Sequence, residues 1–261
     1  MIKIYTFAHK RPDFLELQLK SLQKIEHEYE FIVFNNAIFD LDKSNYNNIK
    51  KWCNENSIKC IDIVNSNILS SRYSGEIIFN DNGTYSNSYV ACAYPLCWAW
   101  ETIISKINEK ICIIDSDMFF VEKINIINLL DKYDLCYNEQ IRGHIDYMWN
   151  GIIFANLNKL PDKGSLNWWC GRCDGVAVDV GGQTYNYLKK YKKQINCLKL
   201  FPLHYNEDLE CNFSPANYEY INIENKNNIL HYRAGSNWND MTSDYHIKKT
   251  IWLKNKLKYD I

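Results

Sequence analysis

Two aspartates separated by one residue are the side chains best placed for chemistry. Residues 110–121, KICIIDSDMFFV, have the pattern of one apolar strand interrupted only by Asp115, Ser116 and Asp117. Residues two apart on a strand project to the same face, so both carboxylates should point one way. Adjacent like charges beside apolar neighbours are unfavourable unless a cation compensates them, usually a divalent metal with oxygen ligands. The pair predicts a metal site; the simpler interpretation is a strand end whose aspartates enter solvent and cap a turn.

Two more acids lie in the segment CDGVAVDVGGQTYNYLKKY. Asp179 stands shortly before a helical pattern that begins at about Gln183, and Asp174 lies a few residues earlier. An aspartate at the start of a helix is most often an N-cap. That interpretation stands beside a role for either carboxylate in catalysis.

The first part of the chain alternates between strand and helix patterns. Apolar strands are predicted over 2–7, 31–34 and 60–64, and helical patterns over 13–25 and 43–56. This βαβαβ order indicates an α/β fold with parallel strands, in which ligands bind beyond the carboxyl ends of the strands. The residues that follow the first two strands are therefore candidates to contact a ligand: Ala8, His9, Lys10, Arg11, Asn35 and Asn36.

The order of several segments resembles the GT-A glycosyltransferases. The Asp-Ser-Asp motif follows a first half of about a hundred residues, as the D-x-D motif does in that family. MWNGIIFANL, with Asn150 and Gly151, is similar to a segment of retaining GT-A enzymes of the glycogenin and lipopolysaccharide galactosyltransferase kind, in which a turn precedes an apolar strand. A hairpin turn before an ordinary core strand explains the same residues.

Near the C-terminus, ILHYRAGSNW resembles the late His-x-x-Gly element of the same family, with one residue more and Asn237 where the family has proline. The resemblance implies that His231 joins Asp115 and Asp117 as a ligand of Mn²⁺ or Mg²⁺, and an imidazole with two carboxylates suits Mn²⁺. Backbone N–H groups of Gly235 and Ser236, with Arg233 as a cationic partner, could contact phosphate. A lone histidine is more often an ordinary core or surface residue.

The expected fold is a single GT-A domain over 1–261, with a mixed, mostly parallel central sheet flanked by helices. Residues 1–120 would form the nucleotide-binding half, 121–241 the acceptor half and 242–261 a basic C-terminal helix. The resemblance implies transfer of a sugar from a UDP- or GDP-sugar to a glycan or other hydroxyl acceptor. Asp179 or Asp174 would act at the sugar, and the residues expected to contact the donor are Ala8, Arg11, Asn35, Asp115, Ser116, Asp117, Asn150, Arg233, Gly235 and Ser236.

Other features leave alternatives open. The tryptophans Trp149, Trp168 and Trp169 could form a stacking platform for an acceptor sugar or pack in the core. The pair Cys170 and Cys173 lacks a second pair for a zinc site and is interpreted as two ordinary thiols. The Lys-rich helical pattern over 243–259 predicts a docked helix with a solvated basic face, or a weak contact with an anionic membrane.

Composition limits the partners and the compartment. Thirty Lys+Arg against 31 Asp+Glu give a formal charge of -1, which argues against nucleic acid as a partner. Ten cysteines without a signal-peptide pattern favour reduced thiols in a cytoplasmic protein. The bias toward Asn, Ile, Lys and Tyr is typical of AT-rich coding sequence, from a virus or a low-GC microbe.

Three other functions compete with the glycosyltransferase interpretation. A haloacid-dehalogenase-type phosphatase also uses a D-x-D motif, with the first aspartate as nucleophile, but that motif normally opens its domain. A nucleotidyltransferase would need a Gly-rich loop after the first strand, where TFAHKRPDF has no glycine. The third alternative is a nucleotide-sugar or glycan-binding module without activity.

Overall fold

The alternating patterns of the first part of the chain form the strands and helices that were predicted. The computed structural model describes residues 1–9, 11–65, 78–203, 218–232 and 243–259. Within residues 1–65, the strands are β1 (Ile2–Ala8), β2 (Tyr29–Asn35) and β3 (Lys59–Asp62), and the α-helices are α1 (Pro12–Ser21) and α2 (Ser44–Glu55). The βαβαβ prediction is confirmed.

A seven-stranded mixed sheet forms the centre of the molecule, in the order β10-β6-β7-β4-β1-β2-β3. Only β7 runs antiparallel to its neighbours, so the sheet is mostly parallel, as predicted. Its other strands are β4 (Lys110–Ile114), β6 (Leu135–Arg142), β7 (Ile145–Asn156) and β10 (Cys197–Leu200).

Two smaller sheets accompany the central one. A four-stranded antiparallel sheet contains β11 (Pro202–Leu203), β12 (Glu219–Ile223), β13 (Lys226–His231) and β5 (Met118–Phe120). A hairpin contains β8 (Gly171–Cys173) and β9 (Val176–Val178). The remaining α-helices described are α4 (Ser88–Thr102), α5 (Ile126–Lys132), α6 (Thr184–Tyr191) and α7 (Ser243–Tyr259). Short 3-10 helices cover Leu22–Lys24, Ala37–Phe39, Ile104–Lys106 and Lys163–Ser165.

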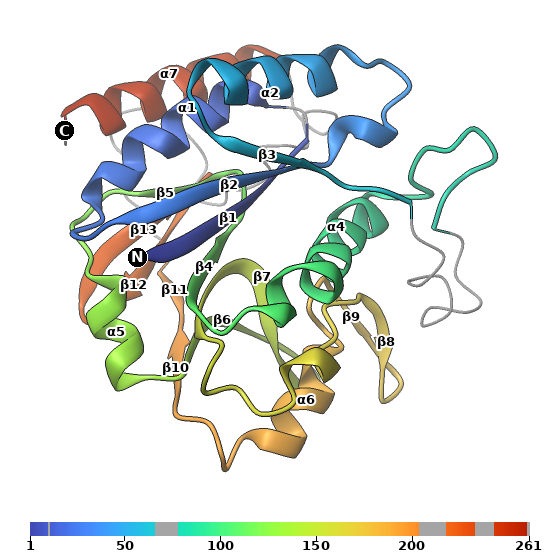
Figure 1. The fold of residues 1–261 in the computed structure, drawn as a ribbon, viewed down its shortest axis with the longest axis vertical. Coiled ribbons are helices and arrows are strands. Elements are labelled where there is room, and N and C mark those ends of the chain that lie inside the picture. The colour runs from blue at the N-terminus through green and yellow to red at the C-terminus, as the bar shows by residue number, and fades with distance from the viewer. Residues whose placement is uncertain (10, 66–77, 204–217, 233–242, 260–261) are drawn as a thin grey trace.

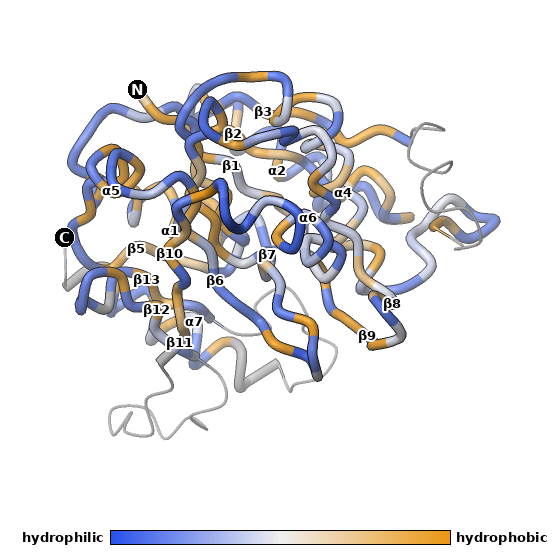
Figure 2. Tube along the Cα trace, turned by 90° about the horizontal axis from the view of Figure 1, so that it is seen from below, coloured by the Kyte–Doolittle hydropathy of each residue, from blue (hydrophilic) through white to orange (hydrophobic). Residues whose placement is uncertain are grey.

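Both faces of the central sheet are buried, because helices or other strands cover each of them. Successive strand residues point to opposite faces, so neighbouring residues pack in different layers. Ile113 and Ile153 face one side, where the buried residues of α4 and α6 pack against them. Cys112 and Ile152 face the other side and pack with α1, α2, α5 and the antiparallel sheet. Figure 1 shows α1, α2 and α7 together on one side of the sheet and α4 and α6 on the other. In Figure 2 the hydrophobic residues gather along the central strands, and the surrounding loops are mostly hydrophilic.

The structure differs from the sequence prediction at Asn150 and Gly151. These residues do not form a turn but lie inside β7, which runs without a break from Ile145 to Asn156. A Cβ atom on Gly151 would lie 2.0 Å from the Trp149 ring and 2.5 Å from the Met118 side chain. The glycine is therefore explained by close packing against β5 rather than by turn formation.

Candidate functional site

The Asp-Ser-Asp motif forms a tight turn at the point where the chain leaves the central sheet. β4 ends at Ile114, and the N–H of Met118 donates to the carbonyl oxygen of Asp115 at 3.1 Å. β5 then starts at Met118 in the antiparallel sheet. The prediction of one continuous strand over 110–121 was wrong at these residues. The turn, rather than strand alternation, places both aspartates at one site.

Gln18 supports this turn from α1. Its side chain is fully buried, and its Nε2 donates to the carbonyl oxygens of Asp115 at 2.7 Å and Met118 at 3.2 Å. The turn is also tied to β7, because the N–H of Asp115 donates to the carbonyl oxygen of Gly151 at 2.8 Å. Hydrogen bonds from the side chain of Gln18 in α1 and to the backbone of β7 thus hold the motif in position.

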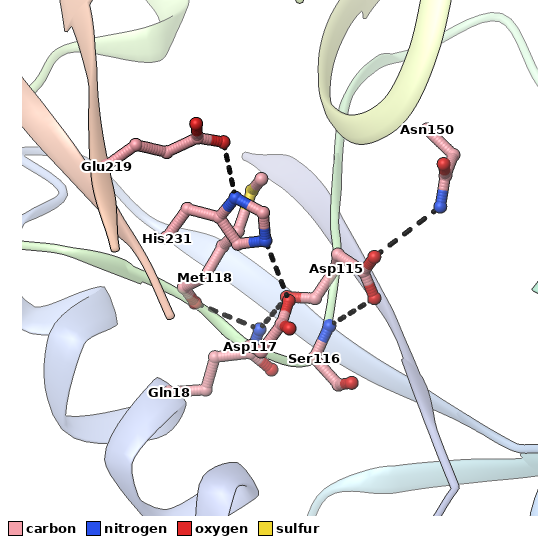
Figure 3. A network of polar contacts seen from close by, with 8 residues as sticks. All are labelled: Gln18, Asp115, Ser116, Asp117, Met118, Asn150, Glu219 and His231. Carbon is pink, nitrogen blue, oxygen red and sulfur yellow. Dashed lines mark hydrogen bonds and ion pairs between the residues drawn. The ribbon is translucent and has the colours of Figure 1, made fainter. Parts of the chain in front are cut away.

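The antiparallel sheet brings His231 to the aspartates. In β13, His231 is paired with Met118 of β5, and the N–H of Tyr232 donates to the carbonyl oxygen of Asp117 at 2.8 Å. His231 Nε2 lies 3.5 Å from Asp117 Oδ1. On the other side of the imidazole, Nδ1 lies 2.7 Å from Oε1 of Glu219 (Figure 3). His231, Asp117 and Glu219 are each buried.

The acids perturb one another electrostatically. Burial and the negative charge of Asp117 raise the pKa of Asp115 from 3.8 to about 7, against the opposing effect of His231. Burial alone would lower the pKa of His231, but the charge of Asp117 and the hydrogen bond to Glu219 outweigh it, so this pKa is raised. An excess of negative charge in a poorly solvated site is the condition under which a bound cation is favourable.

The side chains at this site are of the types that bind a divalent cation, although they are not arranged as in an occupied metal site. Asp115 Oδ1 accepts from the N–H of Ser116 at 2.8 Å, whereas Oδ2 has a long contact of 3.4 Å with Asn150 Nδ2. Oxygen and imidazole ligands suit Mn²⁺ or Mg²⁺. Within the described part of the chain, no group of three or more His, Cys, Asp and Glu side chains is arranged so that it could hold a metal ion.

Three cavities lie at or near this network, and two of them are lined by its residues. The first, of about 60 Å³, is lined by Asp115, Ser116 and Asn150 together with Phe7, His9, Asn36 and residues of α4. The second, of about 430 Å³, lies between α4 and the β8–β9 hairpin. Another, of about 330 Å³, is lined by His231, Glu219 and Trp149. Asp179 and Arg142 line both of the larger cavities, so these cavities meet at the two residues.

Asp179 and Asp174 have different surroundings. Asp179 is half-buried, accepts the N–H of Val180 at 2.8 Å, and donates its own N–H to the hydroxyl of Tyr147 at 3.2 Å. It is not the N-cap of α6, which Gln183 provides. Asp174 instead lies at the tip of the β8–β9 hairpin with φ 45°, next to Gly175, and its carboxylate is 3.8 Å from Lys189 Nζ. The two-residue turn explains this Asp-Gly pair, and Asp174 does not line the cavities described above.

Several residues expected to contact the donor lie elsewhere. Asn35 is fully buried; its Nδ2 donates to the carbonyl oxygen of Tyr46, and its Oδ1 accepts from the N–H of Ala37. Arg11 is buried and bonded to Asp13 and to Thr250 of α7.

Ala8 is a core residue whose carbonyl oxygen accepts from the N–H of Asn36. At the ends of β1 and β2, the cavity is lined by His9 and Asn36 instead. Arg233, Gly235 and Ser236 lie outside the described residues.

The tryptophans divide between the core and the site. Trp168 and Trp169 are 1% and 3% exposed, and Trp168 packs edge-on against Trp100, so these two cannot be a sugar platform. Trp149 is only partly buried, and its ring centroid lies 5.3 Å from that of His231. Cys170 and Cys173 are both buried free thiols, and Cys170 lines the second cavity.

Glu219, Gln18 and Arg142 were not identified from the sequence. Glu219 and Gln18 lie in patterns that look like ordinary strand and helix. They reach the site only through cross-strand pairing and helix packing, which have no local signal.

No protein-family model matches the sequence, and no curated protein matches it. Solved glycosyltransferase structures are similar to the chain at low sequence identity. The mannosyltransferase PcManGT from Pyrobaculum calidifontis, solved with GDP-Man and Mn²⁺, has 9% identity and a TM-score of 0.46, covering 76% of this chain and 54% of that one.

The galactosyltransferase LgtC, solved with donor and acceptor sugar analogues, has 13% identity and a TM-score of 0.37, covering 74% of this chain and 66% of that one. Mouse xyloside xylosyltransferase 1 has 12% identity and a TM-score of 0.42, covering 76% and 84%. The chain thus spans about half the length of the mannosyltransferase and about two thirds of LgtC. The resemblance noted in the sequence agrees with these matches.

Proposed function

We propose that the chain is a glycosyltransferase that moves a sugar from a nucleoside-diphosphate sugar to a hydroxyl group of a glycan or other acceptor. One observation carries the proposal. Asp115 and Asp117 at the end of a central parallel strand, and His231 from a distant segment, meet beside a cavity at the carboxyl edge of the sheet. Ligands of open α/β sheets bind at this edge.

Asp115, Asp117 and His231 would hold Mn²⁺ or Mg²⁺. His231 Nε2 and Asp117 Oδ1 are 3.5 Å apart, a separation at which both atoms could bind one cation. A divalent cation bound there stabilises the charge that develops on a departing diphosphate. The raised pKa of Asp115 supports this assignment, because burial beside Asp117 disfavours the ionised pair without a cation.

The groups around the cation site divide into a donor and an acceptor side. Ser116 and Asn150 line the cavity next to Asp115 and would contact the donor. Asp179 and Trp149 line the cavity next to His231. This cavity offers an aromatic face and carboxylates to a sugar. This cavity of about 330 Å³ has the size of a small-molecule site.

Asp179 is the residue that we place at the reacting sugar. If the reaction inverts the anomeric centre, Asp179 accepts the proton of the acceptor hydroxyl as a general base. If the reaction retains it, the carboxylate stabilises the positive charge of an oxocarbenium-like transition state. We do not assign such a role to Asp174, which lies at the hairpin tip.

We also propose that the protein works in the cytoplasm, because cysteines are frequent and several, such as Cys112 and Cys136, are buried as thiols in the core. No helix of the described residues has the length and apolar character to cross a bilayer.

A thermal-shift screen of UDP- and GDP-sugars with and without Mn²⁺ tests the proposal. Ligands that bind only the native state raise the unfolding temperature by mass action. We expect one nucleotide sugar to stabilise the protein only when Mn²⁺ is present, and Asp117→Asn to abolish both this effect and sugar transfer. Full activity of Asp117→Asn contradicts the assignment. Metal-dependent binding without turnover indicates a binding module instead of an enzyme.

A further inference from the structure

Glu219 is a buried carboxylate on the side of His231 that faces away from Asp117. It is 6% exposed, and its Oε1 lies 2.7 Å from His231 Nδ1 (Figure 3). Burial of a carboxylate is strongly unfavourable unless a polar partner compensates it. The imidazole in direct contact with Glu219 is such a partner.

The strand register places Glu219 against His231. Glu219 begins β12 and is the cross-strand partner of His231 at the end of β13, so both side chains project from the same face of the antiparallel sheet. β13 is in turn paired with β5, which follows Asp117 directly. One small sheet therefore sets the order Glu219, His231, Asp117 through its hydrogen bonds.

We propose that Glu219 is a positioning residue that holds His231 with Nε2 directed at the cation site. This inference rests on the proposed function. A histidine that binds a metal through one ring nitrogen usually donates the N–H of the other to a carboxylate or carbonyl, which fixes the ring orientation and the tautomer. Here Nδ1–H donates to Glu219, and Nε2 is left on the side of Asp115 and Asp117. Glu219 also lines the cavity beside His231, but at the cation site it acts only through His231.

Binding of Mn²⁺ to the full chain tests the inference without a measurement of activity. The free ion is measured by its electron paramagnetic resonance signal. Loss of an outer partner of a metal ligand typically weakens metal binding about 10- to 100-fold, and we expect a loss in this range for Glu219→Leu. Asn222→Ala, on the same strand but lining a different cavity, is the control and should bind Mn²⁺ as the unmodified protein does.

Two conservative variants separate position from charge. Glu219→Gln keeps the length of the side chain and an acceptor oxygen but removes the charge. Glu219→Asp keeps the charge but shortens the side chain by one methylene group. A positioning role predicts that Gln retains more Mn²⁺ affinity than Asp. The opposite order overturns the inference, and this comparison decides even if Glu219→Leu does not fold.

A double-mutant cycle with His231→Gln shows whether Glu219 acts through the histidine. Once His231 is replaced, Glu219→Gln and Glu219→Asp should have no further effect on Mn²⁺ affinity, since residues that act as a unit are not additive. Additive losses contradict the inference. If the unmodified protein and Asp117→Asn bind Mn²⁺ equally weakly, the proposed function fails instead, so the two failures are distinguishable.

Discussion

Asp115 is the residue whose ionisation should make metal binding depend on pH. Its folded pKa of about 7 lies above the ordinary 3.8, so without metal its contribution to stability is present at low pH and is lost as the pH rises through about 7. Mn²⁺ needs the ionised carboxylate and must displace any proton. We therefore expect the increase in unfolding temperature caused by Mn²⁺ to be larger at about pH 8 than at about pH 5.5. Asp117→Asn should show little increase at either pH, and equal increases in the unmodified protein contradict the prediction.

Asp179 and Asp174 form a matched pair for a test of catalysis. Asp179 lines both large cavities, whereas Asp174 lies in a hairpin turn. Loss of a general acid or base typically lowers the rate about 10²- to 10⁴-fold, so Asp179→Asn should lower kcat at least about a hundredfold if Asp179 is that base. Asp174→Asn should leave kcat unchanged, because Asn-Gly also suits a two-residue hairpin turn. Equal kcat values for the two variants would remove Asp179 from the mechanism.

At the scale of elements, the junction of β5 and β7 depends on Gly151. A Cβ atom there would overlap the Trp149 ring and the Met118 side chain. Overpacking of this kind costs about 1–3 kcal/mol, so Gly151→Ala should lower the free energy of unfolding by about that amount and displace Trp149. Urea unfolding measures the change. Gly164→Ala is the control, since a Cβ atom at Gly164 meets nothing within 4 Å, and a loss of equal size there contradicts the packing argument.

Helix α7 has one buried face and one exposed face. Leu253 and Leu257 are buried against α1 and the antiparallel sheet, so removal of the helix would expose the core. Ile247 and Ile251 lie one turn apart and are 50% and 53% exposed, with Lys248 beside them also exposed. Basic and apolar side chains on one exposed helix face are typical of weak contact with an anionic membrane.

At the scale of the whole molecule, the net charge of -1 provides no general attraction to an anionic surface, so any membrane contact must be local. We expect the protein to float with anionic but not with neutral liposomes, and the double variant Ile247→Ser/Ile251→Ser to lose this binding. Lys51→Glu, at an exposed site on α2, is the control and should still bind. Equal recovery of the unmodified protein and the double variant in the unbound fraction rejects the membrane contact.

Much of the fold could be predicted from local patterns in the sequence. The alternation of β1 to β3 with α1 and α2 follows from apolar runs and helical periodicity, and α7 begins and ends within the predicted range. These patterns can be recognised locally, because an amphipathic helix and a buried strand each require a particular spacing of apolar residues. The metal candidates Asp115, Asp117 and His231 were also identified, from residue chemistry and from a family resemblance.

The arrangement of the site depends on contacts between distant segments. The chain turns at Ser116, Glu219 lies opposite His231, and Arg11 and Asn35 bond within the framework instead of lining the cavity. No local pattern encodes these facts, because strand register and sheet order are set by packing and backbone pairing across the whole molecule. Packing across the molecule also decides that Trp168 is buried in the core, whereas Trp149 lies beside His231.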